Sequence, residues 1–222
     1  MCTKDKVTTL NIQEVKNMFI YVGEKIIDKK PLLTQIDSDI GDGDHGVGME
    51  IGLKKATESL HDVPLKSINE VFNIIGKSMI SSMGGASGII FGTFFLGGVK
   101  NFELKEKLNL IDLATIFSAS LEAIKKRGKA SLGDKTMVDA LEPAVEILNH
   151  EAKQTKNLVQ GLEAAEKEAR NGVENTKKYV AKFGRAKSLG ERALGYQDAG
   201  ATTIWIIFKS MKEWIEAMEK NE

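Results

Sequence analysis

Four aspartates stand close together in the first quarter of the chain, with a spacing that suits a metal site. Residues 36–49 read Ile-Asp-Ser-Asp-Ile-Gly-Asp-Gly-Asp-His-Gly-Val-Gly-Met, which places Asp37, Asp39, Asp42 and Asp44 within eight positions. Carboxylates at this spacing repel one another, and a bound cation would relieve the repulsion. Oxygen ligands with no thiol nearby suit Mg²⁺ or Ca²⁺ better than zinc.

The glycines in this stretch favour a ligand-binding loop. They let the backbone turn sharply and approach a ligand closely. A helical pattern follows over residues 46–60, so the last glycines stand at a helix N-terminus, where an anion is favoured. A candidate metal site next to a helix start that favours an anion suggests a nucleotide site. A plain turn is the alternative, because Asp and Gly both favour turns. An EF-hand is excluded, because counting from Asp37 puts Gly41 and Gly48 where acidic ligands are needed.

A second glycine-rich stretch lies at residues 81–98. Gly84, Gly88 and Gly92 recur every four residues and would form one smooth ridge on a helix. Each glycine costs a helix about 1 kcal/mol relative to alanine. Two explanations remain open, namely close packing of a neighbouring helix and a ligand lying against the backbone. The run Gly84–Ser87 also offers free N–H groups and a hydroxyl at a helix start, which suits phosphate.

Two later loops carry further candidate residues. Residues 128–136 differ by one residue from a Walker A loop, but Asp134 interrupts the required Gly-Lys-Thr and no strand precedes it, which excludes a P-loop. Lys135 and Thr136 remain candidates for nucleotide binding, and Thr136 is equally suited to capping the next helix. Residues 183–200 form a polar loop too rich in glycine for a plain helix, and loops this long are usually functional or disordered. Its Arg185 could bind phosphate oxygens in a bidentate manner.

The elements that must position these loops are all predicted to be helices. Apolar residues recur at three- and four-residue steps, and no segment alternates as a strand does. Pro31 marks the end of the first helix. The predicted helices span residues 11–30, 46–60, 69–79, 81–98, 110–126, 137–151, 157–179 and 201–218, with a short helical turn at 32–36. The sequence therefore predicts one all-α domain over residues 1–222, a bundle of about eight helices with its site at one end.

Composition excludes several other classes of protein. The 222 residues carry 31 basic and 31 acidic side chains, so the chain has no basic excess for binding nucleic acid. The single cysteine, Cys2, cannot form an internal disulfide, which fits a reducing cytoplasm. The polar N-terminus lacks the apolar core of a signal peptide. The longest apolar run, residues 89–99, is too short to span a membrane.

Taken together, the loops resemble the nucleotide-binding (L) subunit of bacterial dihydroxyacetone kinases. The matching pieces follow the family's order from residue 37 to residue 202. They are Ile40-Gly-Asp-Gly-Asp-His-Gly46, Gly84-Gly-Ala-Ser-Gly88, Phe91-Gly-Thr-Phe-Phe95, Arg127-Gly-Lys129, Gly133-Asp-Lys-Thr-Met137, Gly184-Arg-Ala186, Leu189-Gly-Glu-Arg192, Gln197-Asp198 and Gly200-Ala-Thr202. This resemblance implies an antiparallel eight-helix barrel that binds ADP or ATP at one end.

The resemblance also implies roles for individual residues. Two Mg²⁺ ions would be held by Asp37, Asp42 and Asp44, which leaves Asp39 outside the set. The implied nucleotide contacts are His45, Gly46, Val47, Gly48, Ala86, Ser87, Gly128, Met137, Arg185, Asp198, Ala199 and Gly200. No catalytic residue is assigned, although Arg185 is a candidate for stabilising charge in the transition state. The chain departs from the family at Gly48, Tyr196 and Ala199, where asparagine, histidine and proline are common.

Members of this family act with partner proteins. The resemblance implies a separate subunit that carries dihydroxyacetone on a histidine and receives the phosphoryl group. It also implies a subunit of the phosphotransferase system that rephosphorylates the bound ADP at the expense of phosphoenolpyruvate (PEP). A homodimer is a candidate assembly. Two alternatives stay open, namely a kinase subunit for another small ketose and a nucleotide-bound regulatory protein that binds a transcription factor.

Overall fold

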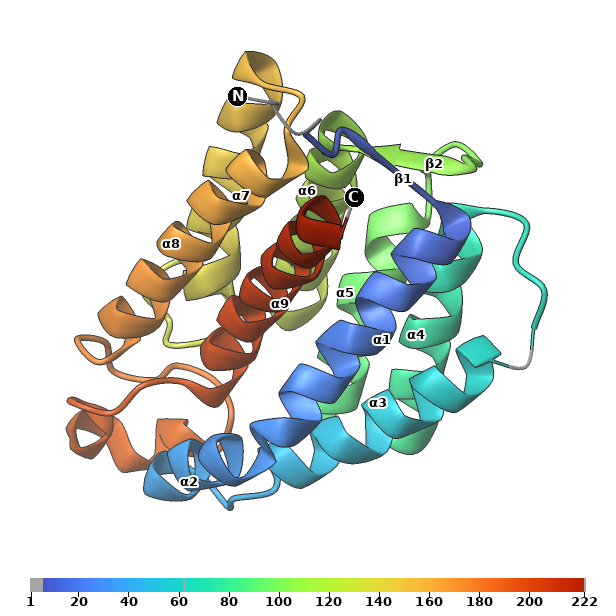
Figure 1. The fold of residues 1–222 in the computed structure, drawn as a ribbon. Coiled ribbons are helices and arrows are strands. Elements are labelled where there is room, and N and C mark those ends of the chain that lie inside the picture. Colours follow the sequence, from blue (N-terminus) through green and yellow to red (C-terminus); the bar gives the residue numbers. More distant parts are fainter. Residues whose placement is uncertain (1–5, 62, 222) are drawn as a thin grey trace.

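The chain is helical over most of its length (Figure 1). The computed structural model describes residues 6–61 and 63–221, so Cys2 lies outside the described part. The elements are β1 (Thr9–Asn11), α1 (Ile12–Asp28), α2 (Lys30–Ile40), α3 (His45–His61), α4 (Ile68–Ser82), α5 (Gly85–Val99), β2 (Lys107–Asn109), α6 (Leu110–Gly128), α7 (Val138–Gln154), α8 (Leu158–Thr176), the 3-10 helix η1 (Arg185–Ala193) and α9 (Ala199–Asn221). The predicted all-α class is confirmed.

Two short strands, however, were not predicted. β1 and β2 pair antiparallel, with Thr9 opposite Asn109 and Asn11 opposite Lys107. Three residues are too few for an alternating pattern to stand out. Each strand ends in an asparagine, Asn11 or Asn109, whose side chain caps the following helix in a capping box. The strand pair therefore fixes the starting points of α1 and α6 relative to each other.

The prediction for residues 30–40 is also wrong, because α2 is a full helix rather than a short turn. Pro31 stands in its first turn, where proline is favoured because the missing N–H would have no helical partner. The proline therefore starts α2 instead of merely ending the helix before it. As a result, Asp37 lies on the last turn of α2 and not in a flexible loop.

The helices pack as a bundle around a common core. Consecutive helices from α3 to α9 pack against one another, and α1 packs against both α9 and α3. The β1–β2 pair and the end of α9 lie at one end of the bundle, whereas α2 lies at the other (Figure 1). The predicted antiparallel barrel is more specific than these contacts and stays a prediction. Within the described residues, no helix combines the length and apolar character needed to cross a bilayer.

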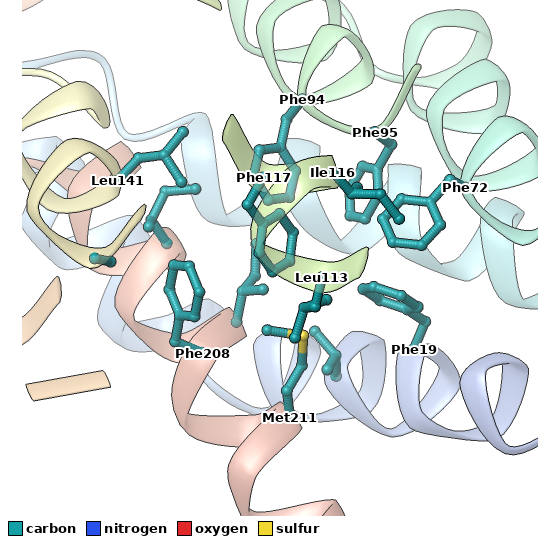
Figure 2. Packing of buried hydrophobic residues seen from close by; sticks show 14 of the residues in the cluster. Phe19, Phe72, Phe94, Phe95, Leu113, Ile116, Phe117, Leu141, Phe208 and Met211 are labelled. Carbon is teal, nitrogen blue, oxygen red and sulfur yellow. The ribbon is translucent and has the colours of Figure 1, made fainter. Parts of the chain in front are cut away.

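Phenylalanines from five helices form the centre of the core (Figure 2). Phe94 of α5 stacks on Phe117 of α6 with ring centroids 5.4 Å apart, and Phe117 meets Phe208 of α9 edge-on at 5.3 Å. Phe19 of α1 and Phe72 of α4 form a further edge-on pair at 4.9 Å. Such pairs stabilise a core beyond the area they bury. They hold the helices rigidly enough to position loops at the bundle's end.

Candidate functional site

The aspartates predicted to bind metal come together at the end of α2. Carboxylate oxygens of Asp37, Asp42 and Asp44 all lie within 4.8 Å of one another. The chain folds back at Gly41, where a Cβ would lie 2.7 Å from the Asp37 carboxylate. Only glycine fits this close approach. Asp39 points elsewhere, because its carboxylate accepts a hydrogen bond from the Gln35 amide at 2.8 Å.

These carboxylates repel one another in the folded protein. Burial, together with repulsion from Asp42 and Asp37, raises the pKa of Asp44. The Arg185 guanidinium opposes this shift, and its Nε lies 2.8 Å from Asp42 Oδ2. One guanidinium faces three acidic side chains, so the cluster keeps an excess of negative charge. Its oxygen ligands and spacing fit a divalent cation such as Mg²⁺.

His45 begins α3 directly beside the cluster, yet its ring is buried. Its Nε2 lies 2.8 Å from Thr203 Oγ1 on α9. Burial lowers the pKa of His45 to about 4, so the ring is neutral near pH 7. Its backbone N–H donates to Asp37 Oδ2 at 3.2 Å. The side chain therefore joins α3 to α9, and its contribution to a ligand site would be a neutral one.

The glycine ridge of α5 has different surroundings along its length. A Cβ on Gly88 would lie 2.8 Å from the Met83 carbonyl oxygen, and a Cβ on Gly92 would lie 2.8 Å from that of Gly76. These two glycines allow α4 and α5 to pack closely. Gly84 and Gly85, by contrast, have open space beside them. Close helix packing therefore accounts for Gly88 and Gly92, whereas a ligand beside Gly84 stays a prediction.

The loop before α7 is held by its own carboxylates. Asp139 accepts hydrogen bonds from the backbone N–H groups of Gly133 and Thr136, and Thr136 Oγ1 accepts one from Val138 at 3.2 Å. The Thr136 hydroxyl thus pairs with the first N–H of α7, whereas the N-cap position itself is Met137, which gives no side-chain cap. A role of Thr136 in nucleotide binding stays a prediction. Lys135 is almost fully buried, and its Nζ donates to two backbone carbonyls. Burial lowers the pKa of Lys135, and the carboxylates of Asp198 and Asp139 partly oppose this shift.

The polar loop at residues 183–200 is more ordered than its sequence indicates. It contains η1, which is interrupted by non-helical geometry at Gly190. Asp198 then caps α9, because its Oδ2 accepts a hydrogen bond from the Ala201 N–H at 2.7 Å. Burial raises the pKa of Asp198 to about 7, and nearby Asp139 adds to the shift while Lys135 opposes it.

These loops surround a pocket of about 970 Å³, a volume within the usual range for small-molecule sites. The predicted site residues that line it are Asp37, Asp42, Asp44, His45, Ala86, Ser87, Gly128, Met137, Arg185, Asp198, Ala199 and Gly200. Gly46, Val47 and Gly48 do not line it. A Cβ on Gly46 would lie 2.6 Å from the Lys30 carbonyl oxygen, so this glycine allows α2 and α3 to pack closely.

Sequence reasoning did not identify the apolar wall of the pocket. Its apolar lining residues are Ile40, Ile89, Ile90, Phe91, Ile124, Ala130, Val138 and Phe183. In the sequence, those that lie on helices cannot be told apart from core positions, and the loop residues Ala130 and Phe183 belong to no apolar pattern. Arg127, Lys135 and Thr136 also line the pocket. Of these, Lys135 and Thr136 were considered from the sequence because of their likeness to a phosphate-binding loop.

Four helices begin in the wall of this pocket. The residues that begin α3, α5, α7 and α9 all stand in its wall, at His45, Gly85, Val138 and Ala199. Each N-terminus carries a partial positive charge, although side-chain oxygens already accept hydrogen bonds from N–H groups at the starts of α3, α7 and α9. The α5 start, at Gly84, has no side-chain cap that would occupy those groups. The pocket therefore contains helix N-termini, which favour anions, and a carboxylate cluster, which favours cations. A metal-bound phosphate requires this combination.

Comparisons with known proteins agree with this geometry. The family model described as DAK2 domain matches residues 39–213. The chain is 35% identical to the ADP-binding subunit DhaL of the PEP-dependent dihydroxyacetone kinase of Escherichia coli, over 91% of this chain and 97% of that one. It is 38% identical to the DhaL subunit of kinase 1 of Listeria innocua, over 85% of this chain and 89% of the relative.

Solved structures give the same result. The crystal structure of the dihydroxyacetone kinase of Citrobacter freundii superposes with a TM-score of 0.72 at 26% identity, covering 96% of this chain and 36% of that longer chain. A second structure of that kinase, in complex with AMP-PNP and Mg²⁺, gives a TM-score of 0.71. This chain therefore belongs to the DAK2 domain family, together with the ADP-binding DhaL subunits of dihydroxyacetone kinases.

Proposed function

We propose that this chain is the ADP-binding subunit of a PEP-dependent dihydroxyacetone kinase. The observation that carries the proposal is the pocket whose wall contains both the starts of four helices and a cluster of three carboxylates. The helix starts alone could not hold a nucleotide beside the aspartates, because its phosphates and the three carboxylates are all negative and would repel one another. A divalent cation between them would remove this conflict.

The aspartates at the end of α2 would hold the metal. Asp37, Asp42 and Asp44 supply enough oxygen ligands for two Mg²⁺ ions if the phosphates and water complete the coordination. Bound there, Mg²⁺ would neutralise charge on the phosphates and orient them for transfer.

The nucleotide itself would lie along the helix starts. Its phosphates would accept hydrogen bonds from free N–H groups at the uncapped N-terminus of α5, near Ser87, and would lie close to His45 at the start of α3. The apolar wall formed by residues such as Ile90 and Phe91 suits the base. Met137, Gly128 and the residues from Asp198 to Gly200 also line this pocket.

Arg185 is suited to act during phosphoryl transfer. Its side chain is 77% exposed and forms an ion pair with Asp42 at the mouth of the site. It therefore has room to turn from the carboxylate to a phosphoryl group. A guanidinium there would stabilise the charge that develops in the transition state. No general base on this chain is needed, because phosphoryl transfer depends mainly on positioning and charge neutralisation.

The acceptor, dihydroxyacetone, would be presented by a separate subunit. Leu132, Leu194 and Tyr196 are exposed and lie on or beside the loops that surround the pocket, so a partner that docks there would cover apolar surface. The donor would be a subunit of the phosphotransferase system that rephosphorylates the ADP in place. A homodimer is compatible with this arrangement, since the proposed docking surface lies around the pocket only.

A single-turnover experiment tests the proposal. The purified chain, loaded with Mg·ATP, is mixed with dihydroxyacetone, either alone or with the dihydroxyacetone-binding subunit of a related kinase. We expect dihydroxyacetone phosphate only in the mixture that contains the partner. Product formed by the chain alone would contradict the subunit assignment. No product in either mixture, with nucleotide bound, would favour another ketose or a regulatory role.

A further inference from the structure

Lys135 is the one charged member of the group of largest fully buried side chains in the described part of the chain, with only 2% of its surface exposed. It lies in the wall of the pocket, between Gly133 and Met137. Burying a lysine is costly unless its amino group is well hydrogen-bonded. Neither the metal site nor the nucleotide contacts proposed above make use of this side chain.

The backbone around Lys135 is held in an unusual conformation. Its φ of 59° lies in the left-handed region, which non-glycine residues seldom occupy and which concentrates at functional sites. Hydrogen bonds on both sides keep it there. Asp139 accepts from the Gly133 N–H at 2.5 Å and from the Thr136 N–H at 2.7 Å. This frame turns the lysine side chain inward.

The amino group of Lys135 joins two segments that are distant in sequence. Nζ donates to the Thr176 carbonyl at 2.6 Å and also to the Tyr196 carbonyl. Thr176 is the last residue of α8, so the positive charge stands at the negative end of that helix. Tyr196 belongs to the segment that leads into α9.

The same contacts lead directly to Asp198. The Asp198 N–H donates to Thr176 Oγ1 at 3.0 Å, and the Gly195 N–H donates to the Lys177 carbonyl at 2.8 Å. Asp198 in turn caps α9 through the Ala201 N–H. A continuous set of hydrogen bonds therefore runs from Lys135, through the end of α8, to the start of α9 in the pocket wall.

We propose that Lys135 is a positioning residue of the nucleotide site, whose amino group ties the end of α8 and residues 195–198 to the loop before α7. By doing so it sets the position of Asp198 relative to Met137 in the pocket wall. This inference rests on the proposed nucleotide function. It adds a residue that acts through Asp198 and the start of α9 and does not itself touch the ligand.

Lys182 offers a matched control. It belongs to the same group of loops, where its Nζ forms an ion pair with Asp134 Oδ1 at 2.6 Å, but its side chain is 67% exposed. Lys182→Met removes one lysine and one interaction with the loop before α7, yet leaves the Thr176 and Tyr196 carbonyls untouched. If both variants lost affinity for Mg·ADP, the cause would be a general loss of stability. A loss confined to the Lys135 variant would show that its amino group positions the site.

The test compares Lys135→Met, Lys135→Gln and Lys182→Met with the wild-type chain. Affinity for Mg·ADP is measured by calorimetry well below the Tm of each variant, and Mn²⁺ alone is titrated by electron paramagnetic resonance. We expect Lys135→Met to weaken Mg·ADP binding about 10- to 100-fold, as removal of groups that orient binding residues usually does. Affinity for Mn²⁺ should change less than about twofold, since the Asp37 cluster is untouched. Lys135→Gln, which keeps a donor, should recover part of the loss.

Hydrogen exchange in the ligand-free protein separates this inference from the proposed function. We expect faster exchange at the amides of Gly195, Asp198 and Ala201 in Lys135→Met, and unchanged exchange in Lys182→Met. If the wild-type chain binds no Mg·ADP, the proposed function fails while the exchange data still decide the positioning role. Wild-type affinity in Lys135→Met, unchanged exchange at these amides, or loss of the whole fold in both Lys135 variants would overturn the inference.

Discussion

Removing one carboxylate from the metal cluster should make the ligand-free protein more stable and the liganded protein less stable. Asp44→Asn is the best single change, because asparagine is as good as aspartate before a helix such as α3. The three carboxylates have oxygens within 4.8 Å of one another. Two unit charges at that distance repel by about 1 kcal/mol in water.

Asp44 has two such neighbours, and Arg185 offsets part of their effect. Because the group is largely exposed and salt screens it further, we expect a net gain of at most about 1 kcal/mol in Asp44→Asn. For a chain of this size that corresponds to roughly 2 °C in Tm. Mg·ADP at 100 times its Kd would stabilise the wild-type chain by about 2.7 kcal/mol, or about 5 to 10 °C. The variant should lose most of this shift.

The assay is thermal unfolding of both proteins in EDTA and in Mg·ADP. The order of the two Tm values should reverse between the conditions. Asp39→Asn is the control, since Asp39 lies on α2 with Asp37 but outside the cluster. It should change Tm only slightly, and by the same amount, in both conditions. An Asp44→Asn protein that is less stable than wild type in EDTA, or that keeps the full Mg·ADP shift, would refute the reasoning.

Two further predictions concern packing and pH. Gly92→Ala would place a Cβ 2.8 Å from the Gly76 carbonyl oxygen and should lower the free energy of unfolding by about 1 to 3 kcal/mol. Gly84→Ala should fold normally and weaken Mg·ADP binding. Equal denaturation midpoints for the two variants would contradict different roles for these glycines. His45 has a folded-state pKa of about 4, so the unfolded chain takes up its proton first. Stability should therefore fall by at most about 3 kcal/mol as pH drops from about 6.5 toward 4. This slope should shrink in His45→Asn but not in His61→Asn, and urea unfolding across this pH range measures it.

Most of the helices could be predicted from the sequence because their apolar residues recur on one face. The exception, α2, shows the limit of that argument. Pro31 is compatible both with the end of one helix and with the start of the next, and local pattern does not choose between them. Packing of α2 against α3 and α9 provides the missing information.

The composition of the site could be predicted better than its geometry. Carboxylates and glycines with unusual spacing mark a binding loop because each destabilises the protein without a ligand. The environment of His45, by contrast, depends on Thr203, 158 positions away. The role of Lys135 depends likewise on the Thr176 and Tyr196 carbonyls, which no side-chain pattern reveals. The apolar wall escaped detection because a residue such as Phe91 looks the same whether it faces the core or a pocket.

The most direct test of the central claim is native mass spectrometry of the purified chain, with and without EDTA. The proposal predicts a bound mass that matches ADP plus two Mg²⁺ ions and disappears on chelation, or an empty protein that gains this mass when Mg·ADP is added. A protein that takes up neither ADP nor Mg²⁺ would contradict the assignment of the Asp37, Asp42 and Asp44 cluster and of the pocket beside it.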